Sequence, residues 1–187
     1  MPKGRNLCLI GFMATGKTTV AQLLARALGW HLRDTDREIE SITGLSIPAI
    51  FAYYGENYFR FLETAVLVRF VEGERQVIAT GGGIVLSAVN RELLKEAGPV
   101  VWLKADLETI LARTQGTHDR PLLETPARKE RVEKLLAERQ ELYRSLADFQ
   151  VDTSQLSPQQ VAERILAWLE NSRELREGRV GKLAPNA

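Results

Sequence analysis

The chain has 187 residues, with 25 Lys or Arg, 24 Asp or Glu and a formal net charge of +1. This length favours a single domain over residues 1–187, and the balanced charge excludes the broad basic surface typical of nucleic-acid-binding proteins. Cys8 is the only cysteine, which excludes an internal disulfide and a thiolate metal cluster and favours a reducing cytoplasm. Because no apolar run approaches the roughly 20 residues of a membrane span, we expect a soluble protein without a membrane partner. A monomer is the expected oligomeric state.

Short apolar runs alternate with longer segments of helical periodicity, which is typical of βαβ units around a parallel sheet. The predicted strands are 6–10, 31–33, 76–79, 100–103 and 149–151. The predicted helices are one that ends at Gly29, then 56–71, 87–97, 129–146 and 158–169. Residues 114–126 are polar, contain Pro and Gly, and are predicted to form a mobile lid. Residues 172–187 have little to bury, so we expect a frayed tail there.

The first predicted strand leads directly into residues 11–18, GFMATGKT, which fit the phosphate-loop pattern GxxxxGK[ST]. An amphipathic helix follows, as the pattern requires. Backbone N–H groups of such a loop and the helix N-terminus hold phosphate oxygens. Lys17 adds a positive charge for the β- and γ-phosphates, and the Thr18 hydroxyl can bind Mg²⁺. A chance glycine-rich turn is the alternative, but it would match this pattern in under about 1% of chains of this length.

Two acids, Asp34 and Asp36, follow the second predicted strand. The carboxyl ends of parallel strands share one edge of the sheet, so we expect both acids to face residues 11–18. One carboxylate can then act toward Mg²⁺, and the other toward a hydroxyl that loses its proton as it attacks the γ-phosphate. The alternative is that one of the two acids caps the next helix.

Two of the predicted helices carry a charge within their apolar stripe. Glu63 lies in the stripe of helix 56–71, one turn after Arg60, and Arg139 lies in the stripe of helix 129–146. Buried charges need partners, so one interpretation is an internal bridge among these three residues. The other is that the two guanidinium groups bind a carboxylate of a small ligand. The glycines 81–83 after the third strand form either a tight turn or a surface where backbone N–H groups approach that ligand.

Two arginines are associated with the predicted lid: Arg113 precedes it and Arg120 lies within it. An arginine that closes on the γ-phosphate excludes water and stabilises the charge of the transition state. The alternative is an arginine on the solvated surface. Together with the phosphate loop and the acids, these residues predict a kinase for a small, anionic, hydroxyl-bearing substrate.

These motifs, in this order, resemble the shikimate kinase family, within the nucleoside-monophosphate-kinase-like phosphate-loop proteins. The resemblance spans roughly residues 7–169 and is carried by GFMATGKTT, DTDREIE, GENYFRFLE, TGGG, RPLL and ERQELY. It implies an α/β fold of three layers, with a five-stranded parallel sheet of order 2-3-1-4-5 flanked by helices. It also implies transfer of the ATP γ-phosphoryl group to the 3-hydroxyl of shikimate with Mg²⁺, a step of the chorismate pathway to aromatic amino acids.

The resemblance further implies roles for individual residues. The catalytic residues would be Lys17, Asp36 and Arg120, with Asp36 as the base. Thr18 and Asp34 would bind the metal ion. The residues implied in nucleotide binding are Gly11, Ala14, Thr15, Gly16, Lys17, Thr18, Thr19, Arg113, Arg120 and Gln155. The residues implied in shikimate binding are Asp36, Arg60, Glu63, Gly81, Gly82, Gly83 and Arg139, with both arginines on the carboxylate and Glu63 orienting them.

The chain departs from the family pattern at two positions. Ala14 stands where a glycine is usual, and Gln155, near the expected adenine site, stands where an arginine or another polar group often appears. Two other functions remain open at this stage. One is a gluconate kinase or another small-polyol kinase, which need not have the paired arginines, and the other is a nucleotide-binding protein without catalytic activity.

Overall fold

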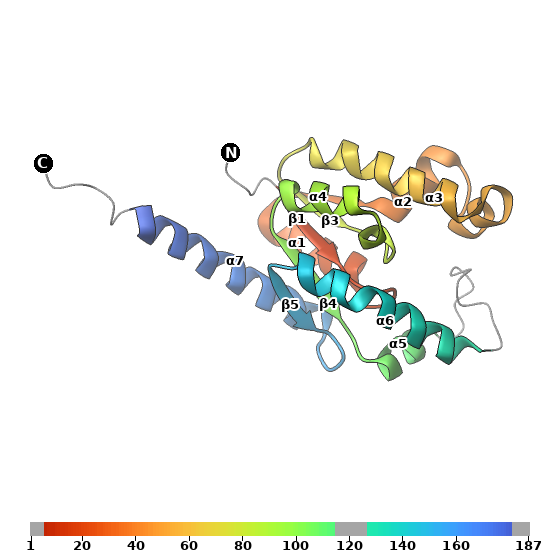
Figure 1. Ribbon diagram of the computed structural model, residues 1–187. Helices are drawn as coiled ribbons and strands as arrows, with labels where there is room; N and C mark the ends of the chain where they lie inside the picture. Colours follow the sequence, from red (N-terminus) through yellow and green to blue (C-terminus); the bar gives the residue numbers. More distant parts are fainter. Residues whose placement is uncertain (1–5, 115–126, 181–187) are drawn as a thin grey trace, which may run out of the picture.

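A five-stranded parallel sheet forms the centre of the molecule, which the computed structural model describes over residues 6–114 and 127–180. The strands lie in the order β2-β3-β1-β4-β5 (Figure 1). They are β1 (Asn6–Ile10), β2 (His31–Asp34), β3 (Gln76–Ala79), β4 (Val100–Lys104) and β5 (Phe149–Asp152). All four strand pairs are parallel. The predicted fold class and strand order are therefore confirmed, and each predicted strand is present with its ends within one residue.

Helices cover both faces of the sheet. Successive strand residues point to opposite faces, so each face presents apolar side chains that need a covering layer. Leu7 and Leu9 of β1 belong to the cluster shared with α1 (Lys17–Leu28) and α7 (Pro158–Val180). Cys8 and Ile10 belong to the opposite cluster, shared with α3 (Ile47–Val71), α4 (Ala88–Ala97) and α6 (Arg128–Leu146). All five residues of β1 are buried, so the phosphate loop is anchored on a fully buried strand in the middle of the sheet of a three-layer structure.

Several helical segments differ from the prediction. The short elements α2 (Thr35–Thr43), η1 (Ile84–Leu86) and α5 (Leu107–Arg113) were not predicted. The helix predicted from residue 56 begins earlier, at Ile47, because Ser46 caps a preceding segment with its side chain. Gly55, with φ 80° and ψ 173°, interrupts this segment just before Glu56. The helical periodicity from residue 56 therefore marks the part of α3 that follows a break.

The C-terminal helix also differs from the prediction. The helix expected over residues 158–169 continues to Val180, so residues 172–180 are helical where a frayed tail was expected. This stretch contains three Arg, two Glu and one Leu, residues that favour helix, although they give it no apolar periodicity. Residues 181–187 lie outside the described residues.

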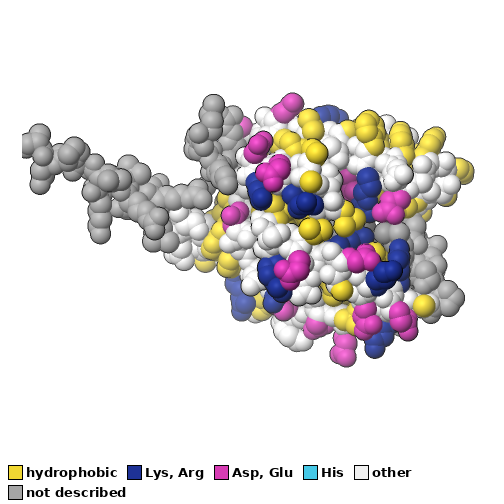
Figure 2. All heavy atoms as spheres, viewed as in Figure 1, with side chains coloured by type: hydrophobic (Ala, Val, Ile, Leu, Met, Phe, Trp, Pro, Cys, Tyr) yellow, Lys and Arg dark blue, Asp and Glu magenta, His cyan; other side chains and the backbone are white. Residues whose placement is uncertain are grey.

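Hydrophobic side chains gather on the outer surface over α3, at the top right of Figure 2. The exposed aromatic residues of this helix are Tyr53, Tyr54, Tyr58 and Phe61. Their rings contact one another in sequence, with 5.0 Å between the centroids of Tyr54 and Tyr58. They face away from the buried stripe of the helix. Among the described helices, none has both the length and the apolar character needed to cross a bilayer.

Candidate active site

The phosphate loop connects β1 to α1 through backbone conformations that favour glycine. Gly11 has φ 144°, and a Cβ at this position would overlap the carbonyl oxygen of Leu103. Gly16, with φ 88°, is the N-cap of α1. Ala14 also has a positive φ, 61°, so a side chain occupies a left-handed position that a glycine would fill with less strain. The loop nevertheless closes in the form that the motif predicts.

Lys17 lies over the loop at the start of α1. Its Nζ donates hydrogen bonds to the carbonyl oxygens of Gly11, at 2.8 Å, and Phe12, at 2.6 Å. Thr15 Oγ1 donates to the same Phe12 carbonyl at 2.9 Å. These contacts hold the lysine against the loop, and its side chain lines the cavity that the loop forms with Asp34 and Asp36.

Asp34 serves two structural purposes at the end of β2. Its Oδ1 accepts hydrogen bonds from the backbone N–H groups of Asp36, at 3.1 Å, and Arg37, at 3.2 Å, and so caps α2. Its Oδ2 accepts a hydrogen bond of 2.7 Å from Thr18 Oγ1 in the first turn of α1. The capping alternative is thus correct for Asp34, but the second oxygen still faces the phosphate loop.

A cavity of about 160 Å³ brings the phosphate loop and both acids together. It is lined by Met13, Ala14, Gly16, Lys17, Thr18, Thr19, Asp34, Asp36, Thr80 and Gly82. The hydroxyl and carboxylate oxygens of Thr18 and Asp34 are ligands of the kind that Mg²⁺ prefers. The described residues contain no group of three or more His, Cys, Asp or Glu placed to hold a metal ion. These two oxygens therefore fit an ion that takes its remaining ligands from phosphate and water, as Mg²⁺ commonly does.

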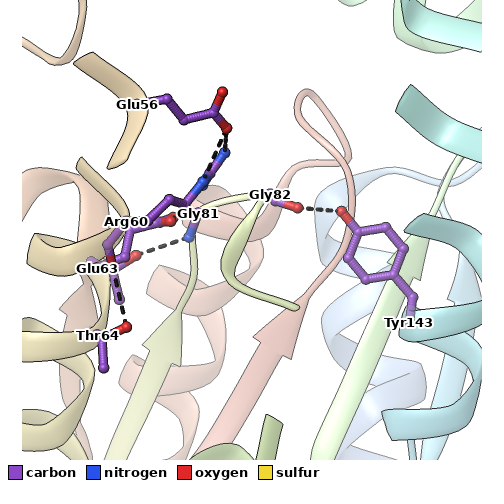
Figure 3. Close-up of polar contacts among 8 residues, drawn as sticks. Glu56, Arg60, Glu63, Thr64, Gly81, Gly82 and Tyr143 are labelled. Atoms are coloured by element: carbon purple, nitrogen blue, oxygen red, sulfur yellow. Dashed lines mark hydrogen bonds and ion pairs between the residues drawn. The ribbon is translucent and has the colours of Figure 1, made fainter. Parts of the chain in front are cut away.

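Arg60 of α3 is held by two carboxylates of its own helix, one turn to either side (Figure 3). Its Nη1 lies 2.5 Å from Glu63 Oε2, and its Nη2 lies 2.8 Å from Glu56 Oε1. The Glu63 side chain is fully buried. Burial raises the pKa of the Glu63 carboxyl to about 7, against the opposing effect of the Arg60 charge. Glu56 was not predicted, although its position four residues before Arg60 is the spacing of a helical ion pair.

The glycine segment after β3 lies against these charged groups. The Gly81 N–H donates a hydrogen bond of 2.8 Å to Thr35 Oγ1, which fixes the segment to the start of α2. A Cβ on Gly81 would lie 2.5 Å from Glu63 Oε1 and 2.7 Å from Asp36 Oδ1. A Cβ on Gly83 would overlap the guanidinium group of Arg60. The absence of side chains here thus allows Asp36, Glu63 and Arg60 to converge on one short stretch of backbone.

Arg139 enters the same site from α6. Its side chain is 3% exposed, and its guanidinium carbon lies 5.7 Å from the centre of the Phe12 ring. Its positive charge acts to lower the pKa of Glu63, although the stronger contact of that carboxyl is with Arg60. Arg139 Nε is buried and has no hydrogen-bond partner within the described part of the chain. The predicted convergence of both arginines with Glu63 is therefore present, with the close ion pair formed by Arg60.

Tyr143, one turn after Arg139, is a site residue that the sequence analysis missed. Its hydroxyl donates a hydrogen bond of 2.5 Å to the Gly82 carbonyl oxygen (Figure 3). Burial raises the pKa of the phenol, while the neighbouring Arg139 acts in the opposite direction. Its position one turn after Arg139 in ERQELY could have indicated that it belongs to the site. A tyrosine in an apolar stripe is, however, usually interpreted as a core residue.

A second cavity, of about 240 Å³, lies on the other side of the phosphate loop. Its lining comprises Ala14, Thr15, Gly16, Val20, Arg113, Thr153, Leu156, Pro158 and Val161. Arg113 donates hydrogen bonds to the Ala14 carbonyl, at 3.3 Å, and to the Thr153 hydroxyl and carbonyl, at 3.1 and 2.7 Å. Gln155 is exposed and is not among the lining residues, whereas Thr153 and Leu156, which were not predicted, are.

The remaining predicted residue, Arg120, lies outside the described residues, as does the expected lid from residue 115 onward. Thr114, at its start, is buried at the end of α5. The described residues thus bring together the phosphate loop, the two acids, Arg60, Arg139 and the glycine segment.

Comparison with known proteins supports a specific family for this arrangement. Residues 13–170 match the family model described as shikimate kinase. A shikimate kinase of Methylococcus capsulatus is 47% identical over 172 residues, which cover 92% of this chain and 96% of that protein. A shikimate kinase of Thermodesulfovibrio yellowstonii is 44% identical, over 87% of this chain and 93% of its own.

A solved structure gives the same result for the fold. The shikimate kinase of Acinetobacter baumannii in complex with shikimate has a TM-score of 0.88 and 40% sequence identity, over 90% of this chain and 94% of its own. Sequence and structure therefore agree over nearly the whole length of both chains. The chain belongs to the shikimate kinase family.

Proposed function

We propose that this protein transfers the γ-phosphoryl group of ATP to the 3-hydroxyl of shikimate. The observation that carries the proposal is the position of Arg60, Glu63 and Arg139 beside the glycine segment, next to the cavity of the phosphate loop. Arg60 is paired with Glu56 and Glu63, whereas Arg139 Nε is buried without a hydrogen-bond partner among the described residues, so the charge of Arg139 is left for a carboxylate of the acceptor. Gluconate also carries a carboxylate, so the arginine pair disfavours only neutral polyols, and membership of the family is what favours shikimate over gluconate.

The described residues divide between the donor and the acceptor. Lys17 and the loop N–H groups bind and orient the phosphates, while Arg113 and Thr153 line the cavity proposed for adenine. Asp36, which lines the phosphate-loop cavity, holds acceptor hydroxyls and accepts the proton of the attacking one. Arg60 and Arg139 hold the carboxylate and so fix the ring relative to Asp36. The predicted roles of Arg120 and Gln155 remain part of the proposal.

Thr18 and Asp34 are the residues proposed to hold Mg²⁺. When bound, the ion neutralises charge on the β- and γ-phosphates and orients them for in-line transfer. The Thr18–Asp34 hydrogen bond keeps both oxygens at the mouth of the loop before the nucleotide enters. We further place the enzyme in the cytoplasm, as a monomer that supplies the chorismate pathway.

A panel of acceptors tests the proposed activity. ADP release is measured with shikimate, quinate, gluconate and nucleoside monophosphates, and the position of the new phosphate is determined by NMR. We expect shikimate to have the highest kcat/KM, and activity confined to gluconate or to a nucleotide, or none, would contradict the proposal.

An arginine variant tests the carboxylate assignment. Arg60→Ala is expected to raise the KM for shikimate by about 100-fold, because a charge-assisted pair is lost, while the KM for ATP stays within twofold. Arg69→Ala is the matched control, since Arg69 is an exposed arginine of the same helix and pairs with Glu38. An unchanged KM for shikimate in Arg60→Ala would show that the carboxylate binds elsewhere.

A further inference from the structure

Tyr143 combines a packing contact with a hydrogen bond to the glycine segment. The residue is fully buried, and its ring stacks on Trp102 of β4 with 5.8 Å between centroids. A phenylalanine would make the same ring contact. The hydroxyl donates its hydrogen to the Gly82 carbonyl, which links α6 to the glycine segment (Figure 3).

The hydrogen bond fixes the orientation of one peptide group. In a trans peptide, the carbonyl of one residue and the N–H of the next point in opposite directions, and the described residues contain no cis peptide. The Gly82 carbonyl points toward Tyr143 and away from Arg60 (Figure 3). The Gly83 N–H therefore points in the opposite direction, and Arg60 is close to Gly83, because a Cβ on this glycine would overlap the guanidinium group. This N–H donates no hydrogen bond to any described residue.

The peptide between Gly82 and Gly83 has little intrinsic preference for this orientation. Because neither residue has a Cβ, rotation of the peptide plane between them meets little steric resistance. The opposite orientation would turn the Gly82 carbonyl, rather than the Gly83 N–H, toward Arg60 and any anion bound there. An acceptor carboxylate would be attracted in the first arrangement and repelled in the second.

We propose that Tyr143 is a positioning residue of the acceptor site, whose hydroxyl holds the Gly82 carbonyl so that the Gly83 N–H faces the acceptor carboxylate beside Arg60. The inference rests on the proposed function, since it concerns how the same site binds shikimate. Arg139 lies one turn before Tyr143 on α6. This helix therefore contributes both a positive charge and the contact that orients a neutral donor.

Tyr143→Phe tests this role, because it removes the hydroxyl and keeps the ring. We expect the KM for shikimate to rise about tenfold, as for the loss of one hydrogen bond to a charged group, while the KM for ATP stays unchanged. Tyr58→Phe is the matched control, since it removes the hydroxyl of an exposed tyrosine in α3. An unchanged KM for shikimate in Tyr143→Phe would overturn the inference.

A substrate without the carboxylate separates positioning from a general structural role. Each enzyme is assayed with shikimate and with the analogue in which the carboxylate is reduced to a hydroxymethyl group. The ratio of kcat/KM between wild type and Tyr143→Phe is expected to be about tenfold with shikimate and near one with the analogue. Equal losses with both substrates would show that the hydroxyl only stabilises the fold.

The wild-type protein provides a readout that does not depend on the variant. The amide proton of Gly83 is expected to shift downfield in NMR spectra when shikimate is added, and to stay in place with the hydroxymethyl analogue. Absence of the shift on shikimate binding would overturn the inference. If wild type phosphorylates shikimate but Tyr143→Phe matches it, only this inference fails, whereas inactivity of wild type toward shikimate removes the proposed function itself.

Discussion

Thr18 Oγ1 donates a hydrogen bond of 2.7 Å to Asp34 Oδ2, and this contact joins the first turn of α1 to the end of β2. The other oxygen of the same carboxylate caps α2 through two backbone N–H groups. One aspartate thus connects the phosphate loop to the strand and helix that carry Asp36. Substitutions that keep the cap but remove the charge can therefore separate metal binding from local structure.

Asp34→Asn is expected to raise the Mg²⁺ concentration for half-maximal activity by about tenfold, because a neutral amide is a weaker ligand for the ion. Asparagine is as good an N-cap as aspartate, so the free energy of unfolding should change little. Asp34→Ala is expected to show the same kinetic change and also to lose about 1 kcal/mol of stability. Mg²⁺ titrations and urea denaturation measure the two effects, and an unaltered Mg²⁺ dependence in Asp34→Asn would place the ion elsewhere.

Gly83→Ala is expected to weaken shikimate binding by displacing Arg60. Gly83 has φ −94°, which alanine adopts without strain, but the new Cβ would overlap the Arg60 guanidinium group. The end of a long side chain can move, so the fold should remain intact while the KM for shikimate rises about tenfold. In an Arg60→Ala background the same substitution should have no further effect. If the effects of the two substitutions on the KM were instead additive in the double variant, Gly83 would act independently of Arg60.

Ala14→Gly is expected to stabilise the protein by roughly 0.5–1 kcal/mol. Ala14 has φ 61°, a conformation that is strained for alanine, and the relief exceeds the added freedom of glycine in the unfolded chain. Ala27→Gly is the control, because Ala27 is exposed within α1 and the same change should destabilise by about 1 kcal/mol. Thermal and urea unfolding of both variants should give shifts of opposite sign; two shifts of the same sign would refute the strain at Ala14.

Glu63→Gln should change how stability depends on pH. Burial raises the pKa of Glu63 from 4.5 to about 7, so the folded chain binds this proton more tightly than the unfolded chain. Its stabilising contribution is complete below about pH 4.5 and is lost as the pH rises through about 7. The melting temperature of Glu63→Gln, relative to wild type, is therefore expected to increase from pH 5 to pH 8. Glu92→Gln, measured in parallel, corrects for the change in net charge, and a relative melting temperature that falls with pH would contradict the direction of the shift.

The sheet was predictable because its strands are short apolar runs with clear boundaries. The elements that were missed lack that signal. In α2 the sequence TDREIESIT has one buried isoleucine, Ile39, so its periodicity is too sparse to recognise. The flanking residues were better indicators, since Asp34 is its N-cap and Gly44, with φ 68°, is its C-cap.

The candidate site was predictable where a charge stood in an apolar stripe or followed a strand. Asp34, Asp36, Glu63 and Arg139 were all found in this way, and the structure brings them to one edge of the sheet. Tyr143 and Thr153 were not, because their contacts are with distant segments: Tyr143 donates to the Gly82 carbonyl, 61 residues away, and Thr153 accepts from the Arg113 side chain, 40 residues away. Such contacts depend on tertiary register, which residue types alone do not specify.

The central position of β1 in the strand order has a consequence for how specificity can diversify. The cavity with Arg113 and Thr153 is built around the segments after β4 and β5, whereas Asp36 and the glycine segment follow β2 and β3. On the proposed assignments, the adenine and the alcohol acceptor are recognised on opposite sides of β1. Substitutions on the β2–β3 side are then expected to change the preferred acceptor without changing the affinity for the nucleotide.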